Sequence, residues 1–524
     1  MKRERTKILA VITGGILFNL VFWQEKMALN AVLYDAFLLV VLFYLYPEAR
    51  RNPTVRWLTF GHLICLGMII INNTLLSKIA FGVTLGLMVG FIEYVHRSVW
   101  YAGGSSLVSA IFVPASVFEA IQVQQTMQSK KKNYGKAFRF AIIPLLLLLI
   151  FFFIYSSANS VFSDLTGKFG NWVSNTFGHL FDFFSWGRFL FLLLGVYLTG
   201  WILLKSNLHL FESREKNCTD NLTRKKIQPS KAKPDLLTAI STTIMGRFGK
   251  GMIALKNSNT VGLISLALLN LLLLVVNIID ITYIWFGFKF DKDVNLYKMI
   301  HQGTDTLIIS ILLAMSILII FFRGNLNFYQ KNKWLKYGAY AWIIQNSILV
   351  ISVFLRDYYY IIQTGLAYKR IGVLFYLALV MTGLITVFWK IYAKKTTYYL
   401  FRVNAWAVII LLVASTAVNW DELIASYNFS RKDKILMPVD YMLTLSNKAI
   451  PLLHQNAEVL KEQWKKQEQL GFVKDPCYSC IDEELKWKKD YFKKEYARLS
   501  WLSFNLADES INEYFHQESR LSSK

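Results

Sequence analysis

Long apolar segments alternate with short polar loops over most of this chain, and this alternation limits its fold more than any other feature. Eleven apolar segments of membrane-spanning length lie between Ile8 and Val418. A helix needs about 20 residues to cross the hydrocarbon core of a bilayer, with a lower limit near 17. Its backbone hydrogen bonds must be satisfied internally. The sequence therefore predicts an all-α polytopic membrane protein with about 11 transmembrane helices.

The expected spans differ in length, because Trp, Lys and Arg at their ends extend some of them to the membrane interface. The five longest are Ala28–Tyr46, Ile79–Val95, Val261–Phe286, Ala339–Leu355 and Ile371–Trp389. The six shorter ones are Ile8–Phe22, Trp57–Ile71, Phe140–Tyr155, Phe189–Leu204, Leu307–Phe322 and Val403–Val418. Two irregular stretches are not counted as spans. Ser105–Gln122 is expected to be an interfacial or re-entrant helix, and Phe162–Trp186 to lie along the outer surface.

Successive loops are alternately rich and poor in Lys and Arg, and this pattern predicts the orientation of the chain in the membrane. With the N-terminus in the cytoplasm, the inner segments carry 32 Lys and Arg residues and the outer loops before the tail carry 10. Cytoplasmic loops of membrane proteins are enriched in these residues. The net charge of +24 is thus read as this bias together with contact to anionic lipids on the cytoplasmic face, and not as nucleic-acid binding.

The domain organisation that follows has two parts. Residues 1–418 are expected to form the transmembrane bundle, interrupted at 206–260 by a flexible basic cytoplasmic loop. Residues 419–524 have no span and are expected to form an extracytoplasmic helical module. Apolar residues recur at helical spacing in Asp440–Gln469 and Ile481–Phe515, which predicts a two-helix hairpin. Cys477 and Cys480 lie in its connection, where a disulfide is expected outside the cytoplasm.

Ionisable and amide side chains within spans are costly, so they are the first candidates for function. Asp35 lies near the middle of an expected span and could bind a proton or cation, or could pack against a polar neighbour. Asn270, Asn277 and Asp280 share one face of another span. They could line a polar path, or could hydrogen-bond between helices.

The polar residues after the fourth expected span do not form a recognisable motif. Glu93 and His96 have the E-x-x-H spacing of helical metal ligands, but such sites need a second copy, which the sequence lacks. An interfacial charge cluster is therefore expected there. Gly103-Gly104-Ser105-Ser106 lacks the lysine of a phosphate-binding loop. We expect no metal site and no cofactor.

Motifs in the last third of the chain carry a family resemblance. They are Gly365-Leu366-Ala367-Tyr368-Lys369-Arg370-Ile371, then Asn428-Phe429, then Asp440-Tyr441-Met442-Leu443-Thr444-Leu445-Ser446 followed by Ala449-Ile450-Pro451-Leu452-Leu453. The chain thereby resembles the multi-pass bacterial families of domains of unknown function 4153 and 4173. It departs from their pattern at Ala367, where Thr is favoured, and at Asn447-Lys448, where an acid is usual. The resemblance implies a bacterial cytoplasmic-membrane protein and supplies no activity.

The motif arginine suggests how the tail meets the bundle. Arg370 opens a span at the predicted outer face, where a guanidinium favours a carboxylate partner. We expect Arg370 to contact Asp357 or Asp440 and so to dock the tail on the bundle.

Three classes of function stay open. Without a catalytic signature, the first expectation is a non-enzymatic envelope scaffold, sensor or accessory protein whose tail binds an envelope partner. The second is a transporter or channel that uses Asp35 and the Asn270/Asn277/Asp280 face. The third is a membrane enzyme acting on a lipid-linked substrate.

Overall fold

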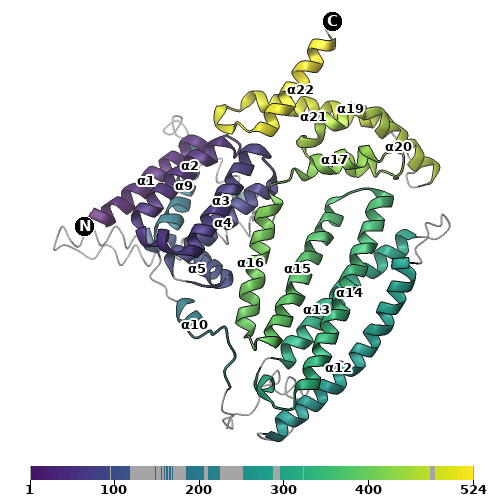
Figure 1. Ribbon diagram of the computed structural model, residues 1–524. Coiled ribbons are helices and arrows are strands. Elements are labelled where there is room, and N and C mark those ends of the chain that lie inside the picture. Colours follow the sequence, from purple (N-terminus) through teal and green to yellow (C-terminus); the bar gives the residue numbers. More distant parts are fainter. Residues whose placement is uncertain are drawn as a thin grey trace. The chain divides into compact units, whose positions relative to one another are not determined.

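The computed structural model is helical throughout the part of the chain that it describes (Figure 1). The described residues are 2–94, 96–117, 185–205, 210–224, 252–286, 296–322, 324–471 and 478–522, with single residues between 148 and 168. Within these ranges the only strand-like pairing is an isolated bridge between Asn221 and Lys395. The predicted all-α class is confirmed.

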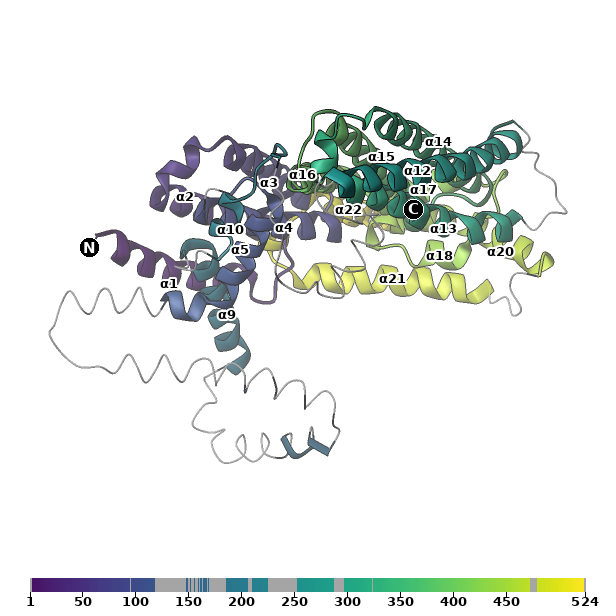
Figure 2. The same cartoon turned by 90° about the horizontal axis from the view of Figure 1, so that it is seen from below.

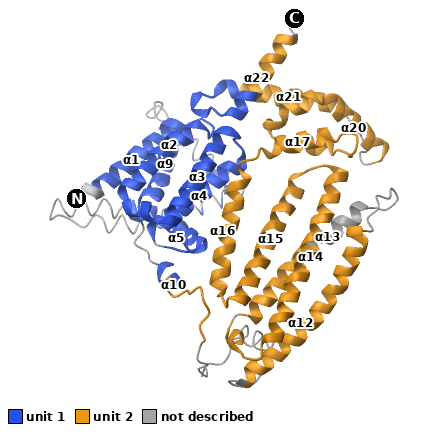
Figure 3. Ribbon diagram, viewed as in Figure 1, with its two compact units in different colours: residues 1–215, 495–510 blue, residues 216–494, 511–524 orange. Residues whose placement is uncertain are grey.

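The chain divides into two compact units, shown in different colours in Figure 3. Unit 1 consists of Met1–Glu215 and Glu495–Ser510, and unit 2 consists of Lys216–Lys494 and Ile511–Lys524. This division falls within the basic loop, whereas the sequence predicts a boundary at residue 418. Each unit therefore contains part of the bundle and part of the tail.

Unit 1 is built around closely packed apolar helices. Its main elements are α1 (Lys2–Phe22), α2 (Leu29–Leu45), α3 (Pro53–Ile71), α4 (Leu75–Glu93), α5 (Val99–Ile111) and α9 (Trp186–Leu203). Two glycines allow α1 and α9 to approach closely. A Cβ atom at Gly15 would lie 2.4 Å from Val196 Cγ2, and one at Gly195 would lie 2.9 Å from the Gly15 carbonyl oxygen. Small residues of this kind are typical of helix contacts in membranes.

Unit 2 contains a second bundle whose helices are longer. Its helices are α12 (Met252–Asp280), continued by a π-helical turn (Ile281–Phe286), then α13 (Leu296–Phe321), α14 (Lys333–Thr364), α15 (Tyr368–Tyr392) and α16 (Thr397–Ser415). Their shared core includes Leu266, Ile311, Leu335 and Leu384, all nearly fully buried. In Figures 1 and 2, α12, α14 and α15 run side by side.

The tail is helical, but both predicted helices are interrupted. The first region contains α18 (Val439–Leu443), α19 (Ile450–Gln455) and α20 (Ala457–Gln469), and the second contains α21 (Tyr478–Arg498) and α22 (Leu506–Ser522). Ser446 interrupts the first helix, since its hydroxyl accepts from the Lys448 N–H and caps a new turn. Ser500 does the same before a short 3-10 turn (Trp501–Ser503). A hairpin of two continuous helices is therefore wrong in detail.

Eight helices among the described residues are long and apolar enough to cross a membrane, and Leu29–Leu45 and Thr306–Phe321 are shorter apolar helices. These ten match ten of the expected spans. The eleventh, Phe140–Tyr155, lies almost wholly outside the described residues, as does most of Phe162–Trp186. Within Ser105–Gln122, the structure describes residues up to 117. This is a multi-pass membrane protein.

Candidate functional site

The family motif forms the junction between the bundle of unit 2 and the tail. α14 is followed by its C-cap residue, Gly365. The φ of Gly365 is +84°, a backbone conformation that glycine adopts easily and that is strained for residues with a Cβ atom. The next residue, Leu366, is held by Asn428 of α17 (Trp420–Ser430). The Leu366 N–H donates to Asn428 Oδ1 at 2.6 Å, and Asn428 Nδ2 donates to the Leu366 carbonyl at 3.0 Å. One fully buried amide thus satisfies both backbone groups of a loop residue.

Arg370 lies in this junction but does not form the expected ion pair. Its guanidinium donates to the Gly365 carbonyl oxygen and stacks over the Tyr360 ring, 4.2 Å from the centroid. Neither Asp357 nor Asp440 lies within ion-pair distance of it. Asp357 is buried and interacts with Arg370 only electrostatically, and Asp440 is exposed. The arginine therefore stabilises the loop carbonyl, and the tail side chain that bonds this loop at Leu366 is Asn428.

Aromatic and acidic groups complete the junction. The Tyr368 N–H donates to the Tyr441 hydroxyl at 2.9 Å, and Ser446 Oγ donates to Asp421 Oδ2 at 2.5 Å. Burial raises the pKa of the Tyr441 phenol, so this hydroxyl stays protonated over the physiological range. Ile371 belongs to the same apolar core as the tail residues Ile424 and Met442. The first residues of α15 and the tail thus share one core.

In unit 1, Asp35 is part of a fully buried polar chain that the sequence did not predict. His62 Nε2 lies 3.0 Å from Asp35 Oδ1, and His62 Nδ1 lies 2.8 Å from Thr84 Oγ1. All three residues have 0% exposure. They come from α2, α3 and α4, so only the packing of the helices brings them together. The sequence contains one clue to this contact, because His62, like Asp35, is an ionisable residue within an apolar segment.

The hydrogen bonds of this chain indicate where its protons lie. Thr84 Oγ1 is within 2.8 Å of the Ala80 carbonyl, to which its hydroxyl donates. Thr84 therefore accepts from the His62 Nδ1–H, and a proton lies between His62 Nε2 and Asp35 Oδ1. Asp35 Oδ2 is buried and has no hydrogen-bond partner in the described part of the chain.

Asn270, Asn277 and Asp280 lie at the contact between α12 and α14. Asn270 Oδ1 accepts from Gln345 Nε2 at 2.8 Å, and Asn277 Nδ2 donates to the Gln345 carbonyl at 3.1 Å. Asp280 pairs with Arg356 at 2.6 Å. Of the two alternatives for this face, a polar path or hydrogen bonds between helices, the observed contacts are of the second kind.

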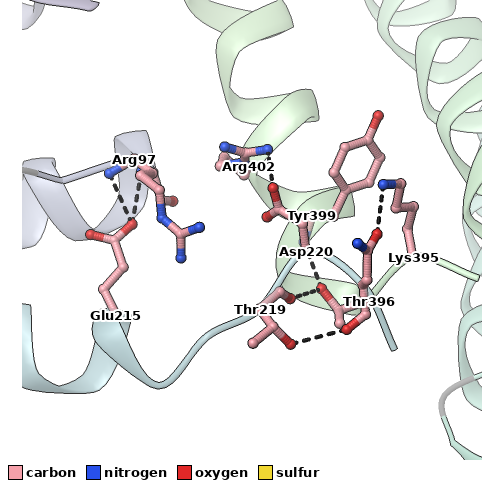
Figure 4. Close-up of polar contacts among 10 residues, drawn as sticks. Arg97, Glu215, Thr219, Asp220, Lys395, Thr396, Tyr399 and Arg402 are labelled. Atoms are coloured by element: carbon pink, nitrogen blue, oxygen red, sulfur yellow. Dashed lines mark hydrogen bonds and ion pairs between the residues drawn. The ribbon is translucent and has the colours of Figure 1, made fainter. Parts of the chain in front are cut away.

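A third polar chain lies where α4 meets α5. His96 Nδ1 lies 2.5 Å from Glu215 Oε2, and His96 Nε2 lies 2.7 Å from Ser105 Oγ. Glu215 Oε1 accepts from the backbone N–H groups of Arg97 and Ser98, at 3.1 and 2.9 Å (Figure 4). Because α4 ends at Glu93, Glu93 and His96 do not share a helix. Both residues are buried, whereas Arg97 is exposed.

The described part of the basic loop makes specific contacts within unit 2. The Thr396 N–H donates to the Asp220 carbonyl at 2.9 Å, and Thr396 Oγ1 donates to the Thr219 carbonyl at 2.6 Å. Asp220 also pairs with Arg402 at 2.8 Å (Figure 4). Residues 210–224 and 252–260, expected to be flexible, are thus a structured segment and the first turns of α12.

The cysteines of the tail are described in part. Cys480, at the start of α21, is disulfide-bonded, and Cys477 lies outside the described residues. Cys65 and Cys218 are not disulfide-bonded.

Comparison with known families assigns the chain. The model of the domain of unknown function DUF4153 matches residues 36–456. The chain belongs to this family. The match extends from α2 to the tail helix α19, so it covers the Gly365–Asn428 junction and the His96, Ser105 and Glu215 cluster of this DUF4153 protein. No curated protein and no solved structure matches it.

Proposed function

We propose that this DUF4153 protein is a scaffold, sensor or accessory protein of a bacterial cytoplasmic membrane. In this proposal the N-terminus is cytoplasmic, the tail lies outside, and the docked tail presents a surface to another envelope protein. The basic cytoplasmic loops contact anionic lipids, and nucleic acid is not a partner. The observation that carries the proposal is the two-point contact of Asn428 with Leu366, because it fixes the tail to the end of a membrane helix.

The contacts within each unit support the proposed orientation. In unit 1 the loop between α1 and α2 binds the tail, since Lys26 pairs with Glu495 at 2.6 Å and the Lys26 N–H donates to Ser503 Oγ at 2.8 Å. In unit 2 the loop between α14 and α15 binds α17. Both loops are outer loops in the topology that the charges predict. A tail that follows the last span contacts both of them only if it lies on the same side.

An exposed aromatic pair on α21 is a candidate for the partner surface. Trp487 and Tyr491 are 58% and 46% exposed, and their rings stack with centroids 5.3 Å apart. Exposed Trp and Tyr side chains held in a fixed geometry are common anchors of protein interfaces.

Protease protection of the tail tests the docking. We expect Asn428→Ala, expressed as the full chain in spheroplasts, to be cleaved in the tail by added trypsin at least tenfold faster than wild type. Asn456→Ala is the matched control, since Asn456 bonds only its own helical turn, through the Leu452 carbonyl. Equal cleavage of wild type and Asn428→Ala contradicts docking, and protection of the tail in all variants until the membrane is permeabilised contradicts the orientation.

Transport is the second candidate, and the Asp35–His62 contact favours it. A carboxylate and an imidazole that share a proton inside a membrane bundle are groups that transporters use to carry protons. If the protein is a transporter, we expect proteoliposomes that contain the wild-type protein to take up solute together with protons. We expect proteoliposomes with the Asp35→Asn variant to lose this uptake. Unchanged uptake in Asp35→Asn would exclude Asp35 from such a path.

A further inference from the structure

Ser105, His96 and Glu215 are arranged as a nucleophile, a base and an orienting acid. The distances along the chain are 2.7 Å from Ser105 Oγ to His96 Nε2 and 2.5 Å from His96 Nδ1 to Glu215 Oε2. All three residues are at least 95% buried. Serine hydrolases use this order of groups on unrelated folds, and it is recognised by geometry rather than by sequence position.

The hydrogen bonds fix the proton that such a reaction requires. Two backbone N–H groups donate to Glu215 Oε1, which stabilises the ionised carboxylate. Glu215 Oε2 then accepts the Nδ1–H of His96. The other ring nitrogen, Nε2, is left without a proton and accepts the hydroxyl of Ser105. The imidazole is therefore in the tautomer that removes a proton from the serine.

Ser105 and Ser109 of α5 differ from several hydroxyl residues inside other described helices, because both bond side chains from outside their own helix, Ser105 to His96 and Ser109 to Glu93 Oε2. Such hydroxyls usually donate to the carbonyl of the preceding turn. Thr59, Thr199 and Ser347 do so, at 2.8, 2.6 and 3.0 Å. Ser105 donates to a histidine from outside its own helix instead.

The neighbouring serine provides a second observation. Ser106 is 3% exposed, and its hydroxyl has no hydrogen-bond partner among the residues that the structure describes. A buried hydroxyl without a hydrogen-bond partner is unfavourable for the folded protein. A group of a ligand that accepts this hydrogen bond removes that cost.

We propose that Ser105, His96 and Glu215 form an acyl-transfer site that cleaves carboxylic esters, with Ser106 donating to the developing oxyanion. Ser105 Oγ bonds to the carbonyl carbon of the ester while His96 Nε2 takes the serine proton. The bond to the alcohol oxygen breaks, and the alcohol leaves with that proton. Water then cleaves the acyl-serine by the same steps, so an acid and an alcohol are formed and no electrons are transferred.

The surroundings of Ser105 indicate an acyl lipid as the substrate class. α5 exposes Trp100, Leu107 and Ile111 to 66%, 67% and 67%. Exposed apolar side chains of a membrane protein mark a place of contact with lipid, and Ser105 is a buried residue of the same helix. We therefore take the ester of an acyl lipid as the substrate class. This activity is independent of tail docking.

A fluorophosphonate probe tests the site without knowledge of the natural substrate. The full-length protein in detergent is incubated with the probe, and the labelled peptide is identified by mass spectrometry. We expect covalent labelling of Ser105, absent in Ser105→Ala. Since a general base contributes about 10²–10⁴-fold, His96→Gln lowers the labelling rate at least 100-fold. Glu215→Gln also lowers the rate, and Ser106→Ala lowers turnover of p-nitrophenyl esters.

Ser347→Ala is the matched control, because Ser347 is a helical serine that bonds its own backbone, and we expect wild-type labelling and turnover. A thermal melt of each variant separates loss of reactivity from loss of fold. If these three residues only hold α10 (Glu212–Lys216) against α5, His96→Gln lowers the melting temperature and the wild-type protein shows no labelling of Ser105. That result overturns the proposal, as does equal labelling of wild type and folded His96→Gln.

Discussion

Asn428 forms hydrogen bonds with both the N–H and the carbonyl of Leu366, 62 residues earlier in the chain. Backbone groups of a loop between two membrane helices are satisfied here by one side chain of the tail. The loop loses these bonds if the tail leaves. This amide, together with the Tyr368–Tyr441 hydrogen bond and the shared apolar core, therefore couples the end of α14 and the start of α15 to the tail.

Gly365→Ala should disrupt this coupling. The substitution places a residue with a Cβ atom at a φ of +84°, and that atom would lie 2.5 Å from Asn428 Oδ1. Strain of this kind costs about 1–3 kcal/mol, so we expect a lower melting temperature in detergent and faster tail proteolysis. Gly372→Ala, whose Cβ would meet nothing within 4 Å, is the control. It should be neutral or stabilising, as Ala replaces Gly inside a helix. Equal melting of the two variants would refute the role of Gly365.

Asp35 and His62 should behave as a coupled pair in a double-mutant cycle. Replacing one partner leaves a buried polar group unpaired, at a cost of about 3–5 kcal/mol, whereas apolar replacement of both partners is often close to neutral. We therefore expect Asp35→Leu and His62→Leu each to destabilise unit 1 more than the double variant does. Thermal unfolding of the four proteins measures the coupling, and additive effects would show that the two side chains do not interact.

Asn270→Ala should lower the free energy of unfolding only modestly, although the Asn270 side chain forms two hydrogen bonds with α14. Its side chain accepts from Gln345 and donates to the Gly338 carbonyl at 3.0 Å. Hydrogen bonds between membrane helices average about 0.6 kcal/mol, with a maximum near 1.7. We expect a loss of about 1–2 kcal/mol in reversible unfolding, and unchanged tail proteolysis. A complete loss of folded protein would mean that this contact does more than join two helices.

Lys488 gives the tail a stability that depends on pH. It is buried and donates to the Leu445 carbonyl at 3.1 Å, and burial lowers the pKa of its ammonium group below the ordinary value of 10.5. Between that lowered pKa and 10.5, the unfolded chain binds more protons than the folded one, so stability rises with pH in this window. The Lys488→Met variant should show a smaller rise than wild type in melting curves of the full chain, whereas exposed Lys486→Met should keep the wild-type rise. An equal rise in wild type and Lys488→Met would assign it to other groups.

The membrane bundle follows from local sequence, as the positions of its helices show. Val261–Phe286 was expected as a span and lies within α12 and the π-helical turn that continues it, and Ile371–Trp389 was expected as a span and lies within α15. Apolar length and flanking polar residues decide whether a segment forms such a helix, and both are visible in one sequence. The breaks in the tail at Ser446 and Ser500 were missed, because an N-cap serine competes with a helical pattern that continues on both sides.

Which polar side chains meet was decided only by tertiary structure. Asp35 was a candidate from its position alone, but its partner His62 is on another helix, and Ser105 and Glu215 are 110 residues apart. Arg370 carried the family motif, and the expected acids do not pair with it, because the Gly365 carbonyl and the Tyr360 ring are closer partners. Composition and periodicity determine which segments enter the membrane, since transfer into lipid depends on each segment by itself. The contacts between segments depend on rotation and depth of each helix in the packed bundle, and these are set by neighbours that are distant in sequence.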